Sequence, residues 1–210
     1  MKIGIPAYDK VDLLDVTGPH EIFNWMNQAG HSVRVLVIAA TAGDVTTRDG
    51  FTFKAPYCFH DAPALDVLWV PGGDIAALKS IMSGPDRTYL DFLIRQSRHA
   101  RYVCSVCEGA MLLAAAGLLD GYEATTHWAF VPCLKTYPRI KVVEGHPRFV
   151  VDRNRVTGGG ISSGLDEALK LVELLTSHQV AQAVQRNTQY YPCPPVASTL
   201  PPATVCPFTW

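Results

Sequence analysis

The sequence of 210 residues lacks several kinds of segment that would define a function class at once. It has no apolar stretch near the roughly 18 residues that cross a membrane. Lys and Arg are scattered without a basic run or an RNA-binding signature, and the formal net charge is −1. The first residues enter a strand pattern without the apolar core of a signal peptide. We therefore expect a cytoplasmic protein that binds neither nucleic acid nor membrane.

The six cysteines, at positions 58, 104, 107, 133, 193 and 206, are expected to be reduced thiols. A chain of this size needs no disulfide staples, and nothing marks it for an oxidising compartment. Cys104 and Cys107 match the CxxC pattern. A redox CxxC pair straddles a helix start, whereas Cys104 is expected on a strand, and no second CxxC or close His pair completes a zinc site. We expect no metal and no cofactor.

The most informative stretch of the sequence is the corner around Cys107. Residues 102–106 are β-branched and aromatic and predict a buried strand, and the Ala- and Leu-rich run that follows predicts a helix. Hydrolases hold their nucleophile at the same kind of corner, and Gly109 supplies a position without bulk. The positive end of the helix predicts a stabilised, strongly reactive thiolate at Cys107. The local alternative is a buried structural cysteine.

Strand and helix patterns alternate along the rest of the chain. This alternation predicts an α/β fold with a mostly parallel sheet and helices on both faces. Residues 45–59, with a turn at Asp49 and Gly50, predict a hairpin. The strands are expected at residues 3–8, 32–40, 65–70, 102–106, 140–144 and 149–156, and the helices at residues 19–29, 75–83, 87–97, 111–117, 127–137 and 164–175.

Two glycine-rich segments stand at predicted strand ends. Gly72 and Gly73 end the strand at residues 65–70, where paired glycines let the backbone approach a ligand. Residues 158–164 open an amphipathic helix, with Ser163 and Asp166 in capping-box spacing. Their glycines do not follow GxGxxG, so a dinucleotide site is disfavoured.

The carboxyl ends of parallel strands meet at one edge of a sheet, and ligands bind there. Cys107, Gly72 and Gly73 all fall at such ends, and Asp15 and His127 are within reach of the same crevice. A thiol, a carboxylate, an imidazole and backbone donors suit covalent catalysis on a small electrophile.

Each of these residues also has a purely structural interpretation. Asp15 can cap a helix, His127 can be a satisfied histidine at a helix start, and Gly72 and Gly73 can form only a turn. The large aromatic residues beside these motifs are expected in the core rather than on a ligand platform. They are Trp69, Tyr102, Trp128 and Phe130.

The chain becomes proline-rich after Tyr190. Proline fixes the backbone and donates no hydrogen bond, so this part is expected to leave the packed domain and to lie extended over its surface or that of a neighbour. We expect one domain over residues 1–190 and a proline-rich tail over residues 191–210.

Five segments in consistent order along residues 1–190 resemble the ThiJ/PfpI superfamily, which is related to class I glutamine amidotransferases, and its isocyanide hydratase branch most of all. The segments are Asp-Val-Thr-Gly-Pro-His at residues 15–20, Val-Pro-Gly-Gly at 70–73, Ser-Val-Cys-Glu-Gly at 105–109, Ala-Thr-Thr-His-Trp at 124–128, and residues 158–164. The resemblance implies a flavodoxin-like three-layer fold, a homodimer and a cysteine nucleophile at the elbow. Isocyanide hydratases add water to an isonitrile carbon and form an N-substituted formamide.

The resemblance also assigns roles to single residues. Cys107 matches the nucleophile and Asp15 its acidic partner, while the backbone amides of Gly72, Gly73 and Glu108 match positions that cradle a developing negative charge. Glu108 departs from the pattern, because the isocyanide hydratase branch typically has threonine after the cysteine and the protease-like branch has histidine. A peptidase is therefore disfavoured. We expect a protonated Glu108 that shares a proton with Asp15 or binds a partner subunit.

Other functions stay open at this point. The catalytic candidates are Cys107, Asp15 and Glu108, with His127 as a substrate contact, and a hydratase or lyase acting on a small molecule fits them best. The alternatives are glyoxalase or deglycase activity on α-dicarbonyls, and a redox-sensing or ligand-sensing stress-response module related to the N-terminal part of AraC-type regulators. Those regulators carry a further helix-turn-helix segment of roughly 100 residues, which we do not find in this sequence.

Overall fold

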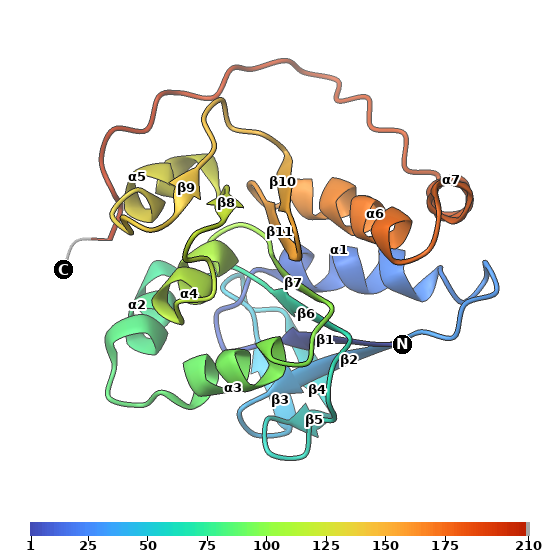
Figure 1. Cartoon of the computed structure of the whole chain (residues 1–210), viewed down its shortest axis with the longest axis horizontal. Helices are drawn as coiled ribbons and strands as arrows, with labels where there is room; N and C mark the ends of the chain where they lie inside the picture. Colours follow the sequence, from blue (N-terminus) through green and yellow to red (C-terminus); the bar gives the residue numbers. More distant parts are fainter. Residues whose placement is uncertain (209–210) are drawn as a thin grey trace.

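The computed structural model describes residues 1–208, which form a central sheet between two layers of helices (Figure 1). The seven strands lie in the order β10-β11-β7-β6-β1-β2-β5, and all run parallel to their neighbours except β10 at the edge. The expected α/β fold is confirmed. The strands are β1 (Lys2–Pro6), β2 (Arg34–Ala39), β5 (Tyr57–Cys58), β6 (Val67–Val70), β7 (Tyr102–Ser105), β10 (Phe149–Asp152) and β11 (Arg155–Gly158).

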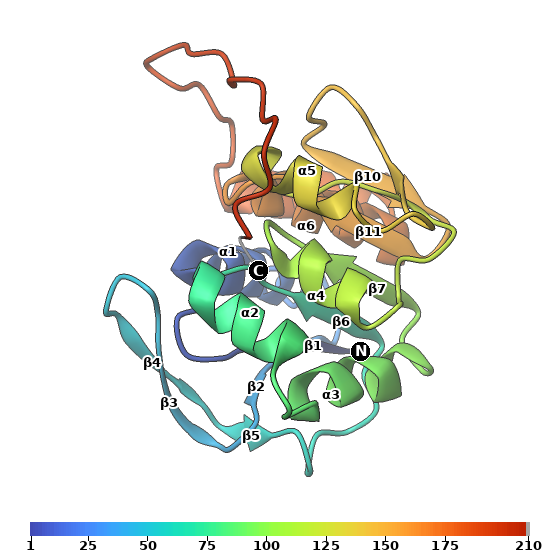
Figure 2. The same cartoon turned by 90° about the vertical axis from the view of Figure 1, so that its left-hand side faces the viewer.

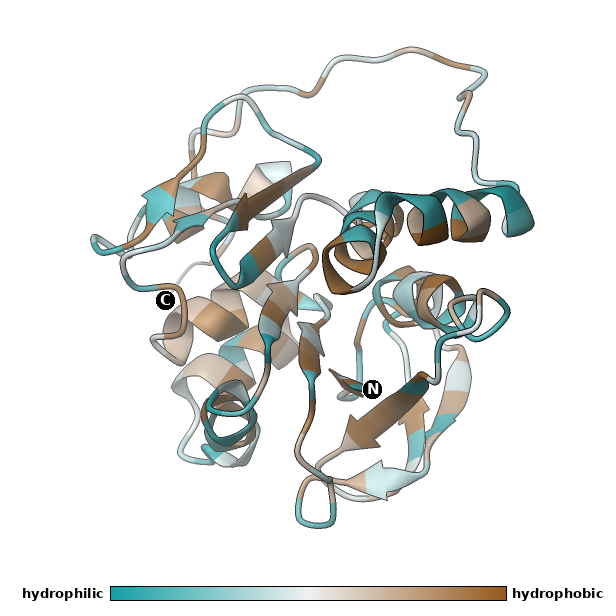
Figure 3. Cartoon of the chain, turned by 45° about the vertical axis from the view of Figure 1, so that its right-hand side comes forward, coloured by the Kyte–Doolittle hydropathy of each residue, from teal (hydrophilic) through white to brown (hydrophobic). Residues whose placement is uncertain are grey.

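Alternate side chains of the central strands enter two separate cores. In β6, Val67 and Trp69 pack on one face of the sheet and Leu68 and Val70 on the other, as the two-residue repeat of a strand requires. Figure 3 shows hydrophobic colour concentrated on these strands. The first face is covered by α1 (Leu13–Asn24), α6 (Ser163–Leu175) and α7 (His178–Asn187), and the second by α2 (Ile75–Ser83), α3 (Thr88–Ser97) and α4 (Gly109–Ala115) (Figure 2).

Short elements complete the rim of the sheet. The expected hairpin is present as β3 (Gly43–Thr46) and β4 (Thr52–Ala55), which pair antiparallel. A second small sheet pairs β8 (Glu123–Ala124) with β9 (Lys141–Val142), and between them lie the 3-10 turn η1 (Trp128–Phe130) and the short helix α5 (Val131–Leu134). Within residues 1–208, each helix is too short or too polar to span a bilayer.

The first helix begins six residues earlier than the sequence indicates. Proline is common at a helix start, but Pro19 lies inside α1. Because Pro19 has no N–H to offer, the carbonyl of Asp15 lacks its helical partner, and the buried indole of Trp69 donates to it at 3.1 Å. Asp15 is therefore held on the first turn of a helix and not on a loop.

The amphipathic helix α6 is present, but its expected capping box is absent. The N-cap is Ser162, whose side chain makes no cap hydrogen bond, and Asp166 binds Arg148. The expected helix at residues 127–137 is shorter, consisting of η1 and α5, and helix α7 was not predicted.

The expectation of reduced thiols is wrong for two cysteines. Cys133 in α5 and Cys206 in the C-terminal segment form a disulfide across 73 residues of sequence. Cys58, Cys104, Cys107 and Cys193 are free. Nothing in the spacing of the six cysteines indicates this pair, because the contact depends on how the C-terminal segment returns to the domain.

That segment follows α7 and contains neither helix nor strand from residue 190 to residue 208. It arches over the β9–β10 connection and returns to α5 (Figure 1). Near its end, Phe208 is only 4% exposed, and its ring centroid lies 5.2 Å from that of Phe130. Residues 209 and 210 of the expected tail lie outside the described residues.

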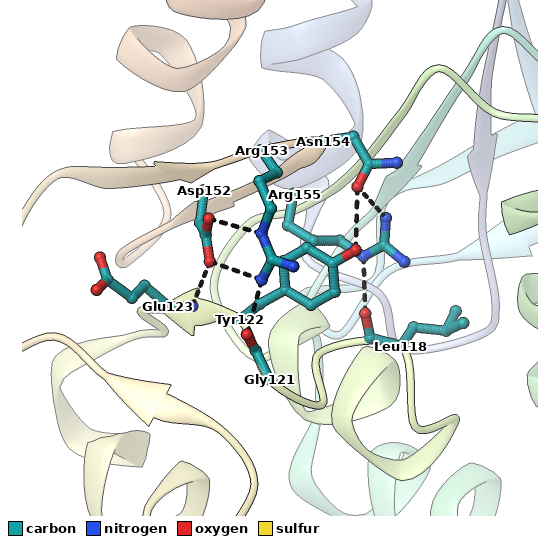
Figure 4. A network of polar contacts seen from close by, with 8 residues as sticks. All are labelled: Leu118, Gly121, Tyr122, Glu123, Asp152, Arg153, Asn154 and Arg155. Atoms are coloured by element: carbon teal, nitrogen blue, oxygen red, sulfur yellow. Dashed lines mark hydrogen bonds and ion pairs between the residues drawn. The ribbon is translucent and has the colours of Figure 1, made fainter.

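A polar network fixes the turn between β10 and β11 (Figure 4). The guanidinium carbons of Arg153 and Arg155 lie 3.8 and 4.6 Å from the ring centroid of Tyr122. The Tyr122 hydroxyl donates to Asn154, and Arg153 also binds Asp152. The network anchors β11, whose continuation after Gly158 reaches the nucleophile corner.

The indole bond to α1 generates a prediction for stability. Trp69→Phe keeps an aromatic ring but leaves the buried Asp15 carbonyl without a donor, which costs about 1–3 kcal/mol of unfolding free energy. Urea denaturation measures this loss. The matched control is Trp25→Phe, whose indole donates to Glu21 near the surface and whose effect should stay within about 0.5 kcal/mol. Equal losses in both variants would contradict the assignment.

Candidate active site

The predicted strand-to-helix corner holds Cys107 in a left-handed backbone conformation, with φ 56°. Two hydrogen bonds keep it there. The Cys107 N–H donates to the Gly159 carbonyl at 2.8 Å, and the Thr126 hydroxyl donates to the Cys107 carbonyl at 2.8 Å. A Cβ on Gly109 would overlap the carbonyl oxygen of Val70, so the turn needs glycine there. The corner therefore has the backbone geometry of a nucleophile elbow.

Asp15 reaches this corner from the first turn of α1. Its Oδ2 accepts the Gly72 N–H at 2.9 Å, and its buried Oδ1 has no partner within residues 1–208. Burial raises the pKa of the Asp15 carboxyl well above its ordinary value, and the nearby charges of Asp12 and Glu108 act in the same direction. Both effects favour the protonated form of the Asp15 carboxyl.

Glu108 follows the nucleophile and is only 4% exposed. The Cys107 thiol donates to its carboxylate, while Oε2 has no partner among the described residues. Burial raises the pKa of Glu108 to about 7, against the lowering effect of the thiol bond. A carboxyl with that pKa can both accept and return a proton near neutral pH.

The expectation of a stabilised thiolate is wrong for the resting site. Burial raises the pKa of the Cys107 thiol, and the charges of Asp15 and Glu108 raise it further. The backbone N–H of Ile161 donates to the sulfur and opposes this effect, but it does not reverse it. The sequence pattern reveals the helix dipole but not the burial. The carboxyl in contact with the Cys107 thiol is that of Glu108.

The expected proton sharing between Glu108 and Asp15 is replaced by two separate pairs. Glu108 pairs with the thiol, and Asp15 pairs with the Gly72 amide. Gly72 lies where these pairs meet, since a Cβ on it would come within 2.8 Å of the Cys107 Cβ and 2.5 Å of Glu108 Oε2. Its N–H is already engaged by Asp15. Gly73 pairs with Val11 in an isolated bridge.

His127 caps a helical turn, as its structural interpretation expects, and it lies at the edge of the site, where its role as a substrate contact stays a prediction. Its Nδ1 accepts the Ala129 N–H at 3.3 Å and lies 3.9 Å from Glu108 Oε1, too far for a hydrogen bond. Burial lowers the pKa of His127, so the ring is neutral near pH 7. With Nδ1 as acceptor, Nε2 carries the proton.

Sequence reasoning missed several residues that shape the site. Arg48 in the β3–β4 turn pairs with the buried Asp12 at 2.7 Å, beside Asp15. Gly159 and Ile161 supply the carbonyl and the N–H that bind Cys107. Thr126, Gly159 and Ile161 lie within the quoted segments at residues 124–128 and 158–164, but the sequence assigned them no role at the thiol. The others come from segments whose approach depends on the tertiary fold.

Two trios of side chains have their ligand atoms within 4.8 Å of one another: Cys107, Glu108 and His127, and Asp12, Asp15 and Cys107. Thiolate, imidazole and carboxylate are ligands that Zn²⁺ accepts. Both trios contain the nucleophile, so an ion bound to either would block it. The absence of a metal from the reaction stays an expectation.

The fold and the elbow define a class of protein, and the chain belongs to the DJ-1/PfpI family, whose model matches residues 1–174. It is 40% identical over 201 residues to the isonitrile hydratase of Pseudomonas putida, covering 96% of this chain and 83% of that protein. A solved ThiJ/PfpI family protein from Pseudomonas syringae superposes with a TM-score of 0.81 at 32% identity, covering 93% of this chain and 77% of the other.

The family relatives also include regulators. The chain is 29% identical over 191 residues to the HTH-type transcriptional regulator GbdR of Pseudomonas aeruginosa. The match covers 90% of this chain but spans only half of that protein.

The raised pKa of Glu108 generates a prediction for the pH dependence of stability. The folded protein retains a proton on Glu108 between pH 4.5 and about 7, where the unfolded chain has lost it, so wild-type stability falls as pH rises through this window. Glu108→Gln removes that fall. The difference in unfolding free energy between the variant and wild type, measured by urea denaturation, should shift in favour of the variant by on the order of 3 kcal/mol between pH 4 and pH 8.

The matched control is Glu144→Gln. The Glu144 carboxyl is exposed, and its hydrogen bond from Lys135 lowers its pKa, so this variant should not reproduce the gain. Parallel pH profiles for wild type and Glu108→Gln would show that Glu108 is ionised in the folded protein throughout the window.

Proposed function

We propose that this protein is a cysteine-dependent hydratase that adds water to an isonitrile carbon and releases an N-substituted formamide. The observation that carries the proposal is the pairing at the elbow: a thiol that donates to a carboxylate of pKa about 7, with the protonated Asp15 within 4.8 Å of the sulfur. The 40% identity to an isonitrile hydratase supports the same reaction.

The first half of the reaction is addition of the thiol to the isonitrile. Glu108 accepts the thiol proton as the Cys107 sulfur forms a bond to the terminal carbon. The same carbon needs a proton, and Asp15 donates it. The product is a thioimidate with a carbon–sulfur bond to Cys107, a carbon–nitrogen double bond, an ionised Asp15 and a protonated Glu108.

The second half is hydrolysis of this thioimidate. The Asp15 carboxylate takes a proton from water as the oxygen adds to the carbon, and Glu108 protonates the nitrogen. The hydroxyl proton then passes through Glu108 to the departing sulfur as the carbon–sulfur bond breaks. The sum is one isonitrile and one water giving one formamide, with Cys107, Asp15 and Glu108 restored.

We propose a homodimer as the working assembly. Leu14, Phe51 and Ile75 are exposed apolar residues, and they belong to α1, the β3–β4 hairpin and α2, which surround the site. A cytoplasmic location and the absence of a nucleic-acid partner likewise remain proposals. The second of these is supported by the near-neutral net charge of −1, which provides little attraction for nucleic acid.

The test of the reaction is turnover by the purified protein. Cyclohexyl isonitrile and methylglyoxal are offered separately, and proton NMR follows the formyl signal of the formamide and the loss of the dicarbonyl. We expect formamide with the first compound. Consumption of methylglyoxal alone would overturn the hydratase proposal in favour of a glyoxalase or deglycase.

Variants of the acid test its role. Asp15→Asn keeps the shape of the side chain and an oxygen that can accept the Gly72 N–H, but it removes the acid that protonates the isonitrile carbon. We expect kcat/KM to fall at least about 10²-fold. Circular dichroism should show an intact fold. The control Asp12→Asn changes a neighbouring buried carboxylate that is already paired with Arg48, and it should lose less than about 10-fold. Near-normal turnover by Asp15→Asn refutes the assignment, and Cys107→Ser should be inactive.

A further inference from the structure

A cavity of about 340 Å³ opens beside the nucleophile. Four residues that line this cavity also contact Cys107 or lie close to Glu108. Thr126 and Gly159 line the cavity and hydrogen-bond the backbone of Cys107, and Ile161 lines it and donates to the Cys107 sulfur. His127, the fourth shared residue, faces Glu108. A molecule that reacts at the sulfur therefore has its remaining atoms directed towards this cavity.

The outer wall of the cavity comes from the C-terminal segment. Leu200 lines the cavity opposite the elbow loops, although it is 53% exposed overall. Among the described residues that line the cavity, Leu200 is the one that comes after α6 in the sequence. Without the C-terminal segment the cavity would be open to solvent on this side.

The segment is fastened near its beginning. The Tyr190 hydroxyl donates to Asp166 at 3.1 Å, and the amide of Gln185 donates to the Tyr190 carbonyl at 3.2 Å. Asp166 also binds Arg148, which itself lines the cavity. The first attachment point thus lies beside the cavity.

The segment is also fastened near its end. Cys206 is bonded to Cys133 in α5, and Phe208 is buried against Phe130. The ring centroid of Phe130 lies 6.0 Å from that of His127, on the other side of the cavity. The stretch that carries Leu200 is therefore suspended between two attachments, and Figure 1 shows it crossing from α7 to α5.

Within residues 1–208, the cavity offers a ligand no unpaired Lys, Arg, Asp or Glu side chain, and His127 and His146 also line it. Arg148 is the single Lys, Arg, Asp or Glu among the lining residues that the structure describes, and its guanidinium is occupied by Asp166 and Ser162. Trp128, Ile161 and Leu200 contribute apolar surface. Such a lining favours an uncharged alkyl or aryl group over an ionised one.

We propose that the C-terminal segment, residues 190–208, is a tethered wall of the substrate site, and that Leu200 limits the size of the uncharged organic group carried on the substrate nitrogen. The proposal rests on the proposed isonitrile reaction for the identity of the substrate. The wall itself depends only on the position of Leu200 in the lining of the cavity, together with residues that bind Cys107.

The test compares a small with a large substrate. Leu200→Trp fills the outer cavity, so kcat/KM for cyclohexyl isonitrile should fall at least about 10-fold, while methyl isonitrile stays within about 2-fold of wild type. Leu200→Ala should raise KM for cyclohexyl isonitrile several-fold without changing kcat. The matched control is Val196→Trp, on the same segment but outside the cavity, which should leave the ratio of the two substrates unchanged. An unchanged ratio in Leu200→Trp overturns the proposal.

The tether is tested by removing its covalent link. Cys206→Ser releases the end of the segment without altering a residue of the elbow, and it should weaken binding of cyclohexyl isonitrile as Leu200→Ala does, with methyl isonitrile unaffected. Thermal unfolding shows whether the domain stays folded. Wild-type kinetics for both substrates in a folded Cys206→Ser protein would show that the disulfide does not hold the wall.

A last measurement separates this proposal from the proposed function. In a Cys58→Ser/Cys193→Ser background, the rate of Cys107 modification is followed by peptide mass spectrometry with N-methylmaleimide and N-cyclohexylmaleimide. Leu200→Trp should slow only the larger reagent. If Leu200→Trp slows only the larger reagent and no isonitrile is turned over, the proposed wall stands and the proposed hydratase function is wrong. If isonitrile is turned over but Leu200→Trp has no size-dependent effect in either assay, the hydratase function stands and the proposed wall is wrong.

Discussion

The structure of the site depends on keeping Cys107 in a left-handed backbone conformation that costs about 1–3 kcal/mol. The carbonyl of Gly159 and the hydroxyl of Thr126 bind its two backbone groups, and they come from the segments that follow β11 and β8. The elbow is therefore held by two segments that are far apart in the sequence. Since the Tyr122 network anchors β11, the strain at Cys107 is supported by contacts far from the reacting sulfur.

Burial decides the electrostatics of the site. Asp15, Glu108 and the Cys107 thiol all have pKa values raised by loss of water, so burial favours the protonated form of each group. The two carboxyls have different partners, since Asp15 accepts the Gly72 amide and Glu108 contacts the Cys107 thiol.

Much of the fold and of the candidate site could be predicted from local pattern. Strand-helix alternation defines the sheet, and the change of pattern around Cys107 places it at the corner. The start of α1 could not be predicted, because Pro19 is tolerated inside the helix only when Trp69 takes over the freed carbonyl. The direction of the Cys107 pKa shift and the contact of Ile161 with its sulfur depend on burial and on long-range approach, which local pattern does not contain.

The reacting groups and the wall of the cavity come from different parts of the chain. Cys107, Asp15 and Glu108 lie inside residues 1–174, which the family model matches, while Leu200 lies beyond them. The cavity beside the elbow is lined on one side by residues that bind Cys107 and also by Leu200, which belongs to a suspended segment with no helix or strand. A change in that segment alters the space for a substituent without moving the elbow, since its attachments are on α5, α6 and α7 and not on the nucleophile turn. Choice of substrate can therefore change in this architecture while the proton transfers at Cys107 remain the same.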